Sequence, residues 1–344
     1  MRNRPMSELL MVEQRRGRAP RDGSHWIREG GQLIEGQDSN LRLSELRSGL
    51  VCHGGVRAVA ADAADAQVEE ALEALHDSDY LTALREIPAD RPVILHGMAA
   101  PGLEPDIPVS AGLVAAAHEA VRTAIAAADR IAGGAQFSYA VCRPPGHHAG
   151  PDFCGGYCYF NNAAVAVRTL REAGLGPVGI LDLDLHYPNG TSVLVEEMDG
   201  AVLHSLHAAP VTNVAPDTVL PRAEGERAVA FAGSPGAAAY LKEVAASVEA
   251  LAAEAAVLVV SLGYDTVAGD PHGSWDFAPE IFAEVGRILA APGLPVCVIQ
   301  EGGYSLPLLA PCSYAFAAGL LEERGRHFPR MAGGNVDRAG GLVR

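Results

Sequence analysis

The stretch FSYAVCRPPGHHAG, residues 137–150, joins an apolar run to a polar turn that carries two adjacent histidines. Residues 137–143 predict a buried β-strand, because short apolar runs that end in turn residues are typical of such strands. The Arg-Pro-Pro-Gly turn excludes a helix interior at this point, since proline fixes φ and lacks an N–H donor. We therefore expect His147 and His148 in a loop that follows directly on a strand.

Apolar runs and helical segments alternate from this stretch to about residue 323. Strands are predicted at residues 137–143, 178–185, 201–207, 257–265 and 295–304, and helices at 161–174, 191–198, 237–255, 279–291 and 309–323. Strands that alternate with helices favour an α/β fold whose mostly parallel sheet is covered by helices on both faces. No repeat or linker interrupts the pattern, which indicates a single domain.

The chain before this alternation is less regular. Residues 58–87 have apolar residues at helical spacing with a break in the middle, and residues 113–131 predict a further helix. Between them, the prolines of residues 87–110 exclude a regular helix and predict a shaped loop. Asp106 in this loop is either a turn carboxylate or a fixed acceptor that faces a substrate. Residues 1–55 carry no motif with a mechanism, so their role stays unassigned.

The composition indicates a globular protein with an acidic surface. The 344 residues are 49% apolar, enough for a sizeable core, and the formal net charge is −16. This charge disfavours nucleic-acid binding, which depends on clustered Lys and Arg, and favours a cationic substrate, although it also serves solubility alone. Neither a membrane-spanning run nor a signal-peptide pattern is present, so we expect a cytoplasmic protein without membrane partners.

Four polar motifs directly follow predicted strands. They are RPPGHH (143–148), DLDLH (182–186), SLGYD (261–265) and EGGY (301–304). The carboxyl ends of parallel strands share one edge of the sheet, and ligands of open α/β sheets bind outside that edge. We therefore expect a single functional site to which all four motifs contribute.

Two of these motifs contain the residues expected to bind a metal. Asp184 and His186 are two positions apart and point the same way in an extended chain, and Asp265 follows another strand. One nitrogen and two carboxylates with an open position suit a catalytic Zn²⁺, and Fe²⁺, Co²⁺ or Mn²⁺ would also be accommodated. The alternative is that the aspartates only cap helices. Asp182 is expected to hold a neighbouring histidine or a monovalent cation.

The histidine pair and a tyrosine supply the proton chemistry that such a metal needs. His147 and His148 offer a base and an acid. Asn189 would fix the tautomer of one imidazole and Asp182 that of the other, so that the two rings differ in pKa and in role. Tyr304, which follows two glycines, can donate its hydroxyl to an oxyanion opposite the metal.

Five stretches resemble one enzyme family. RPPGHHAG (143–150), GGYCYFNNAAVA (155–166), LDLDLHYPNGT (181–191), SLGYDT (261–266) and QEGGY (300–304) look like the zinc-dependent histone deacetylase superfamily, with the closest likeness to its bacterial acetylpolyamine amidohydrolase and histone-deacetylase-like branch. The resemblance runs from about residue 70 to 322. It implies the arginase/deacetylase fold, with a parallel eight-stranded sheet between helices, and hydrolytic removal of acetyl or another acyl group from an amine.

The resemblance also assigns roles to residues of these motifs. It implies Zn²⁺ ligands at Asp184, His186 and Asp265, a general base at His148, an electrostatic partner at His147 and a carbonyl-polarising hydroxyl at Tyr304. It implies a structural K⁺ site at Asp182, Asp184, His186, Ser205 and Leu206. Substrate-binding roles are implied for Gly156 and Tyr157, which would line an acyl-lysine tunnel, and for Asp106, which matches a loop aspartate that grips the substrate backbone.

The resemblance bears on the domain boundaries as well. It places a deacetylase catalytic domain at residues 56–325, followed by a C-terminal tail at 326–344. Residues 1–55 would be packed on this domain or lead into it.

Three departures from the family pattern concern the substrate. His272, a further substrate-binding candidate, stands where many relatives have Leu and a polyamine-selective relative has an acidic residue. The loop at 208–226 lacks the aromatic residue of the opposite tunnel wall, and the loop at 91–110 is shorter than the insertion that builds a dimer in polyamine enzymes. The substrate therefore stays open among acetyl-lysine, an acetylated polyamine and a small acylated metabolite, and so does assembly as a homodimer or homotetramer.

Two other functions remain as alternatives to a zinc-dependent deacetylase. A binuclear manganese ureohydrolase on the same fold would need a further histidine and more carboxylates than the single complete ligand set found here. A non-catalytic protein that binds acyl ligands has no need of a proton shuttle, so the presence of both histidines and Tyr304 argues against it.

Overall fold

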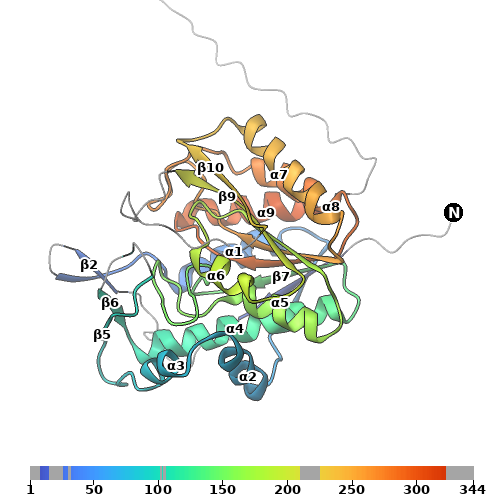
Figure 1. The fold of residues 1–344 in the computed structure, drawn as a ribbon. Coiled ribbons are helices and arrows are strands. Elements are labelled where there is room, and N and C mark those ends of the chain that lie inside the picture. The colour runs from blue at the N-terminus through green and yellow to red at the C-terminus, as the bar shows by residue number, and fades with distance from the viewer. Residues whose placement is uncertain are drawn as a thin grey trace, which may run out of the picture.

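An eight-stranded sheet forms the centre of the computed structural model, which describes residues 8–14, 26–29, 32–100, 103, 106–209 and 225–322, with backbone alone at 26–29, 32–34 and 106. The strands, in spatial order, are β10 (Arg227–Ala232), β9 (Ala201–Ala209), β8 (Val178–Asp182), β11 (Val257–Leu262), β12 (Val296–Gln300), β7 (Phe137–Val141), β1 (Leu9–Glu13) and β4 (Val56–Ala60). Every neighbouring pair is parallel. The prediction of a single α/β domain with a mostly parallel eight-stranded sheet is confirmed (Figure 1).

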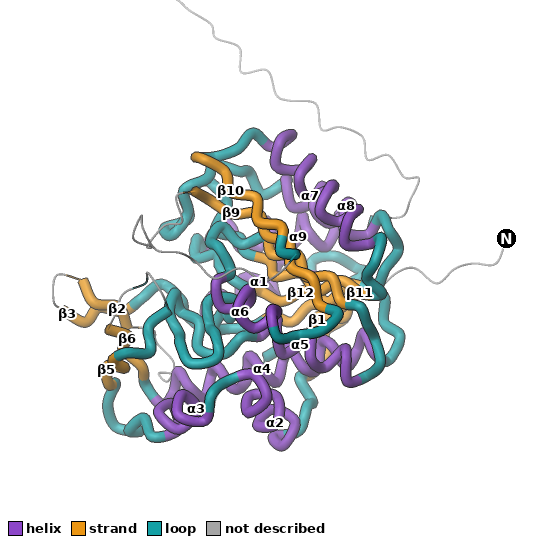
Figure 2. Tube along the Cα trace, in the orientation of Figure 1, coloured by secondary structure: helices purple, strands orange, loops and turns teal. Residues whose placement is uncertain are grey.

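Helices cover both faces of this sheet, as Figure 2 shows. One face packs against α4 (Ala111–Ala132), α5 (Asn162–Glu172) and α6 (Asn189–Glu196), and α2 (Asp65–Leu75) and α3 (Ser78–Arg85) pack on the outer side of these helices. The other face packs against α1 (Asn40–Val51), α7 (Ala237–Ala252), α8 (Ile281–Ala290) and α9 (Leu306–Leu321). None of the helices in the described part of the chain is long and apolar enough to cross a membrane.

Burial on both faces explains why the inner strands are continuous apolar runs. In β11, Val257 and Val259 belong to the core on one face of the sheet, whereas Leu258, Val260 and Leu262 belong to the core on the other. Successive side chains of a strand point to opposite faces, so a strand between two helical layers needs apolar residues at nearly every position. This pattern is what made the inner strands predictable.

The first 60 residues contribute more to the sheet than the sequence indicated. β1 lies between β7 and β4, and α1 packs on α9, so no boundary separates residues 8–14 and 40–55 from the rest of the domain. The helical prediction is wrong at residues 58–60, which belong to β4. This segment forms a strand because it pairs along its whole length with β1, a partner that local spacing does not reveal.

Two small antiparallel sheets lie outside the central sheet. One joins β2 (Trp26–Glu29) to β3 (Gln32–Glu35), and the other joins β5 (Val93–His96) to β6 (Asp106–Val109). The loop predicted at residues 87–110 therefore contains a short strand pair, with Pro108 in a two-stranded ladder where proline is tolerated at an edge. The tail predicted at 326–344 lies outside the described residues.

Candidate active site

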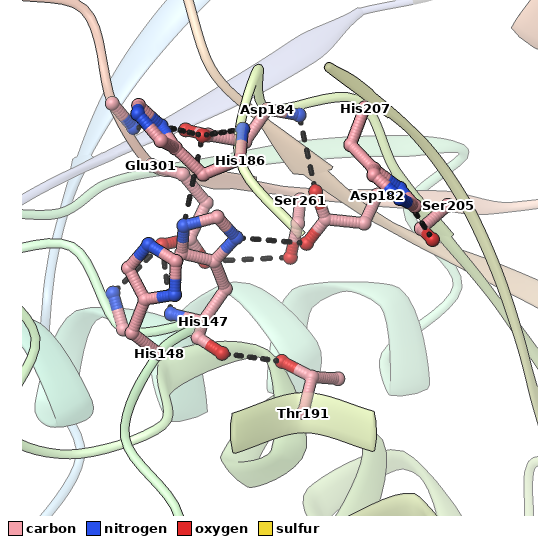
Figure 3. A network of polar contacts seen from close by, with 12 residues as sticks. His147, His148, Asp182, Asp184, His186, Thr191, Ser205, His207, Ser261 and Glu301 are labelled. Carbon is pink, nitrogen blue, oxygen red and sulfur yellow. Dashed lines mark hydrogen bonds and ion pairs between the residues drawn. The ribbon is translucent and has the colours of Figure 1, made fainter. Parts of the chain in front are cut away.

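The four polar motifs meet at the carboxyl ends of the parallel strands. RPPGHH follows β7, DLDLH spans the end of β8, SLGYD ends just beyond β11, and EGGY follows β12. Figure 3 shows side chains from these segments turned toward one another. The arrangement follows from topology, because parallel strands that share one direction end at the same edge.

Asp184, His186 and Asp265 converge at this edge, and we call them the ligand triad. One potential ligand atom from each lies within 4.8 Å of those of the other two. Nδ1 of His186 is 3.0 Å from Oδ1 of Asp184 and 3.1 Å from Oδ2 of Asp265. Two carboxylate oxygens and one imidazole nitrogen at this spacing fit the donor set of a divalent transition metal such as Zn²⁺.

Main-chain groups hold the two carboxylates in place. Gly302 donates its N–H to Oδ2 of Asp184 at 2.8 Å, and Leu185 donates its N–H to Oδ1 of Asp265 at 3.1 Å. Carboxylates held by neighbouring N–H groups keep their remaining lone pairs directed at a metal.

Two glycines leave the space that this convergence needs. A Cβ atom at Gly302 would lie 2.6 Å from both Oδ2 of Asp184 and Oδ2 of Asp265, and one at Gly263 would lie 2.3 Å from Oδ2 of Asp184. Real Cβ atoms do not approach oxygen this closely, so a side chain at either position would push the carboxylates apart. The close approach of the backbone to the two carboxylates therefore requires glycine at both positions.

The electrostatics of the triad also fit a bound cation. Burial, together with the charge of Asp184, raises the pKa of Asp265 to about 7. Burial alone would lower the pKa of His186, but its hydrogen bonds to the two aspartates raise that pKa to about 10. Two buried carboxylates this close repel each other unless a positive charge lies between them, and a bound divalent ion would supply that charge.

His147 and His148 lie beside the triad on the loop of residues 143–150, which we call the tandem-histidine loop. Nδ1 of His148 is 2.6 Å from Oδ1 of Asn189, whereas Nδ1 of His147 is 3.3 Å from Oδ2 of Asp182. The two ring centroids are 4.1 Å apart. Each histidine therefore lies beside the partner that the sequence suggested, one a neutral amide and the other a carboxylate.

The different partners give the two imidazoles opposite pKa shifts. Burial acts to lower the pKa of His147, but the charges of Asp184 and Asp182 raise it to about 10. Burial lowers the pKa of His148 well below its ordinary value, and the positive charge of His147 lowers it further. A pair of titratable groups with separated pKa values is typical of an acid–base site.

Tyr304 is buried at the same edge, and its main chain is tied down. Its N–H donates to Oδ2 of Asp270 at 2.6 Å, and the N–H of Ser305 donates to the same oxygen at 2.9 Å. Burial raises the pKa of Tyr304 well above its ordinary value, so the hydroxyl keeps its proton at neutral pH. It is therefore available as a hydrogen-bond donor.

Arg42 of α1 is the main contributor to the site that sequence reasoning missed. Its guanidinium donates to the carbonyl oxygens of Gly303 at 2.7 Å and Glu301 at 2.6 Å, and its Cζ lies 4.6 Å from the ring centroid of Tyr304. A buried ion pair with Asp38 compensates its charge. An arginine with i+4 spacing from an aspartate is common on exposed helices, so no sequence signal distinguished this pair.

Tyr157 and His272 form an aromatic wall next to Tyr304. Oη of Tyr157 is 3.2 Å from Nε2 of His272, and the ring centroid of Tyr304 is 4.7 Å from that of His272. Gly156 has a φ of 54°, and a Cβ there would lie 2.4 Å from Cδ2 of His148. These three candidates for substrate binding are therefore brought together beside the acid–base residues.

Two further substrate-related predictions fall on parts of the chain that are not fully described. Asp106 begins β6, opposite His96, but its side chain lies outside the described residues. Most of the loop at 208–226, predicted to leave one wall open, also lies outside them.

The residues expected to bind K⁺ lie at or just beyond the end of β8 and in the middle of the neighbouring strand β9. Asp182 is opposite Ser205 in the parallel register, and its Oδ1 accepts the N–H of Asp184 at 3.0 Å. Oγ of Ser205 is 3.2 Å from Nδ1 of His207 (Figure 3). Leu206 is fully buried next to Ser205. The structure thus places the group across two neighbouring strands, at the end of β8 and within β9.

A sequence model of the histone deacetylase domain matches residues 38–320. The chain belongs to the histone deacetylase domain family. The resemblance inferred from the five motifs is therefore confirmed, and the family match begins earlier than residue 70 because it includes the segment around Arg42.

Relatives of this histone deacetylase domain include acetylpolyamine amidohydrolases. The acetylpolyamine amidohydrolase of Mycoplana ramosa is 37% identical over 215 residues, which cover 58% of this chain and 61% of that protein. Acetylpolyamine amidohydrolase 1 of Pseudomonas aeruginosa is 34% identical over 211 residues, which cover 58% of this chain and 60% of that protein. The chain thus spans about three fifths of the length of these relatives.

A solved structure supports the fold assignment. The acetylpolyamine aminohydrolase from Burkholderia pseudomallei superposes with a TM-score of 0.74 at 24% identity, covering 92% of this chain and 99% of that one. At this identity the likeness establishes the shared fold of the histone deacetylase domain.

Proposed function

We propose that this histone deacetylase domain is a zinc-dependent amidohydrolase that removes acetyl or another acyl group from an amine. The observation that carries the proposal is the placement of the ligand triad beside two histidines with different partners, one held by Asn189 and one by Asp182. A metal site alone would serve binding, but an adjacent base with a fixed tautomer serves hydrolysis.

The ligand triad, Asp184, His186 and Asp265, would hold the ion through two carboxylate oxygens and Nδ1 of the histidine. When bound, a divalent ion supplies the Lewis-acid chemistry that activates water and polarises a carbonyl oxygen. Fe²⁺ and Co²⁺ are accepted by the same donors. The structural K⁺ is likewise proposed at Asp182 and its neighbours, at the end of β8 and in the middle of β9.

His148 would carry the proton. Because Nδ1 of His148 donates to the amide oxygen of Asn189, the Nε2 atom of this neutral ring is left with a free lone pair. It can accept a proton from the attacking water and later deliver that proton to the leaving amine. His147, between Asp182 and Asp184, stays charged and supports the developing negative charge nearby.

Tyr304 would donate its hydroxyl to the carbonyl oxygen as negative charge develops there. Asp270 fixes the tyrosine's main chain, and Arg42 contacts the face of its ring, so the donor is positioned before substrate arrives. Preorganised donors of this kind contribute more than mobile ones, because no reorganisation is needed during the reaction.

The substrate class we propose is a cationic or lysine-like acylated amine. Support comes from the net charge of −16, from the aromatic wall of Tyr157 and His272, and from the acetylpolyamine amidohydrolases among the relatives. Aromatic faces favour both an alkyl chain and a nearby cation.

A rate comparison with metal counting tests this function. We would assay acetyl-lysine peptides, acetylated polyamines and longer acyl-lysines on one sample whose metal content is measured, with Asp265→Asn as the control that lacks a ligand. We expect about one Zn²⁺ per chain, hydrolysis of at least one class, and loss of both in the variant. Two tightly bound Mn²⁺ per chain with release of urea from a guanidino substrate would overturn the proposal in favour of a ureohydrolase.

A further inference from the structure

We propose that Glu301 is a positioning residue that holds the tandem-histidine loop in place against the ligand triad. This inference rests on the proposed function, because it gives a task to a residue that the reaction itself does not use. Glu301 lies in the EGGY motif, immediately after β12, and its side chain is fully buried. Among the described residues, its carboxylate hydrogen-bonds to neither imidazole of the histidine pair, so it would act through the main chain.

The side chain of Glu301 joins the ends of three strands. Its Oε2 accepts the N–H of Gly146 at 2.7 Å and the N–H of His147 at 3.1 Å, both in the loop after β7. Its Oε1 accepts the hydroxyl of Ser261, in β11, at 3.3 Å. The main-chain N–H of Glu301 donates to the carbonyl oxygen of Leu262 at 2.9 Å, which anchors the residue to the sheet.

The two N–H groups need this acceptor because, within the described part of the chain, Glu301 is the only hydrogen-bond partner of either group. Buried N–H groups are nearly always paired, and an unpaired one carries the full cost of leaving water. Gly146 packs so tightly against the start of α5 that a Cβ would lie 2.5 Å from the main-chain nitrogen of Asn162. The loop therefore cannot turn its N–H groups elsewhere without losing this packing.

The main chain of His147 is held by hydrogen bonds at both its N–H and its carbonyl oxygen. Its N–H is held by Glu301, and its carbonyl oxygen accepts the N–H groups of Gly190 at 3.1 Å and Thr191 at 3.0 Å. The ring of the same residue must reach Asp182 and Asp184. A shift of this main-chain segment would move both imidazoles relative to the triad. Misplacement of a catalytic group by about 1 Å costs on the order of a hundredfold in rate.

The segment that carries Glu301 also anchors the triad. Gly302, the next residue, donates its N–H to Asp184. Two adjacent residues after β12 thus hold both parts of the site: Glu301 holds the histidine loop, and Gly302 holds the ligand Asp184. This sharing explains why a side chain that directly follows β12, rather than one from the histidine loop itself, is suited to set the distance between base and metal.

An alternative function for Glu301 is to bind a metal together with His147 and Cys158. The potential ligand atoms of these three residues lie within 4.8 Å of one another. Both ring nitrogens of His147 already face carboxylates, and Oε2 of Glu301 already accepts two N–H groups. The Cys158 thiol donates to the carbonyl oxygen of Gly156. The potential metal-ligand atoms of this cluster therefore already have other partners. The geometry favours positioning of the histidine loop as the function of Glu301.

Isosteric variants of Glu301 test the proposal. In Glu301→Gln the amide oxygen still accepts both N–H groups and the NH₂ donates to Ser261, so we expect kcat within about threefold of wild type. In Glu301→Met the volume is similar but the acceptor is lost, so we expect kcat to fall roughly 10- to 100-fold with zinc content unchanged. Ser261→Ala is the matched control, because it removes a partner of the carboxylate without touching the histidine loop.

Two further measurements separate positioning from a general loss of stability. In a His148→Ala background, Glu301→Met should lower kcat by less than about threefold more, since residues that act as one unit are not additive. Amide hydrogen exchange of residues 143–150 should be faster in Glu301→Met than in Glu301→Gln. Should the Met variant fail to fold, Glu301→Asp, whose carboxylate is one methylene too short, takes its place in both measurements.

The exchange measurement also keeps this inference distinct from the proposed function. If the wild-type protein hydrolyses none of the acyl amines, the proposed function fails, yet exchange in residues 143–150 still decides whether Glu301 holds the loop. Wild-type exchange in that segment of the Met variant, or fully additive losses in the double variant, would overturn the role of Glu301.

Discussion

His148 and Asn189 form the closest contact around the acid–base pair, with Nδ1 of the imidazole 2.6 Å from Oδ1 of the amide. The amide oxygen accepts and therefore keeps the proton on Nδ1, which leaves Nε2 unprotonated. A neutral amide also stabilises the imidazolium less than a carboxylate would. This contact keeps His148 a base next to a histidine that is charged.

Asn189→Asp should move the pH dependence of the reaction. A carboxylate beside His148 stabilises the protonated ring, so the pKa of His148 rises and the free base appears only at higher pH. We expect the acid limb of the kcat/KM profile to shift upward by on the order of one pH unit. Asn189→Ser, which adds no charge, is the control; an acid limb that stays in place in the Asp variant would contradict the assignment of the base.

His148→Ala and Tyr304→Phe should each lower kcat about a hundredfold or more while zinc stays bound. Neither residue belongs to the ligand triad, so the loss reports on proton transfer and on carbonyl polarisation. Steady-state rates and metal content on the same preparations check this. Wild-type turnover of an acetyl-lysine reporter by either variant would refute the role given to that residue.

Gly302→Ala should impair metal binding without altering any ligand. The added Cβ would lie 2.6 Å from an oxygen of each of the two aspartates, so the carboxylates must separate. We expect zinc affinity to fall roughly 10- to 100-fold in a chelator competition assay, as for other disturbances of groups that orient ligands. Gly54→Ala, where a Cβ meets nothing within 4 Å, should bind zinc like wild type.

His76 should make the fold less stable in mild acid. Burial lowers its pKa to about 4, and its ring bridges the carbonyl oxygen of Gly150, at 2.7 Å, and the N–H of Asn161. Its unfolded pKa is about 6.5, so above that pH it contributes no pH dependence, and as pH falls toward 4 the unfolded state binds the extra proton. The resulting loss in free energy of unfolding is about 2 kcal/mol at pH 5.

Urea unfolding at pH 7.5 and pH 5 measures this loss. His76→Gln removes the titration, so the variant should lose about 2 kcal/mol less than wild type between the two pH values. Other titrating groups are common to both proteins and cancel in the difference. Equal losses in the two proteins would show that His76 is not the titrating group.

The sequence by itself determined the inner strands and the identity of the chemical groups. Strands such as β8 and β11 are buried on both faces, so each is a nearly continuous apolar run that can be detected locally in the sequence. The DLDLH motif and the tandem histidines are also local, since their residues are neighbours in the chain. Their position after strands was enough to predict that they meet at one edge.

Only the tertiary structure decided which distant groups support that site. β1 is a strand because it pairs with β4 and β7, although β7 begins more than a hundred residues later. Arg42 reaches Gly303 across 261 positions, and Glu301 reaches His147 across 154. Pairing of main-chain donors and buried charges depends on what folding brings within about 3 Å, and no local pattern carries that information.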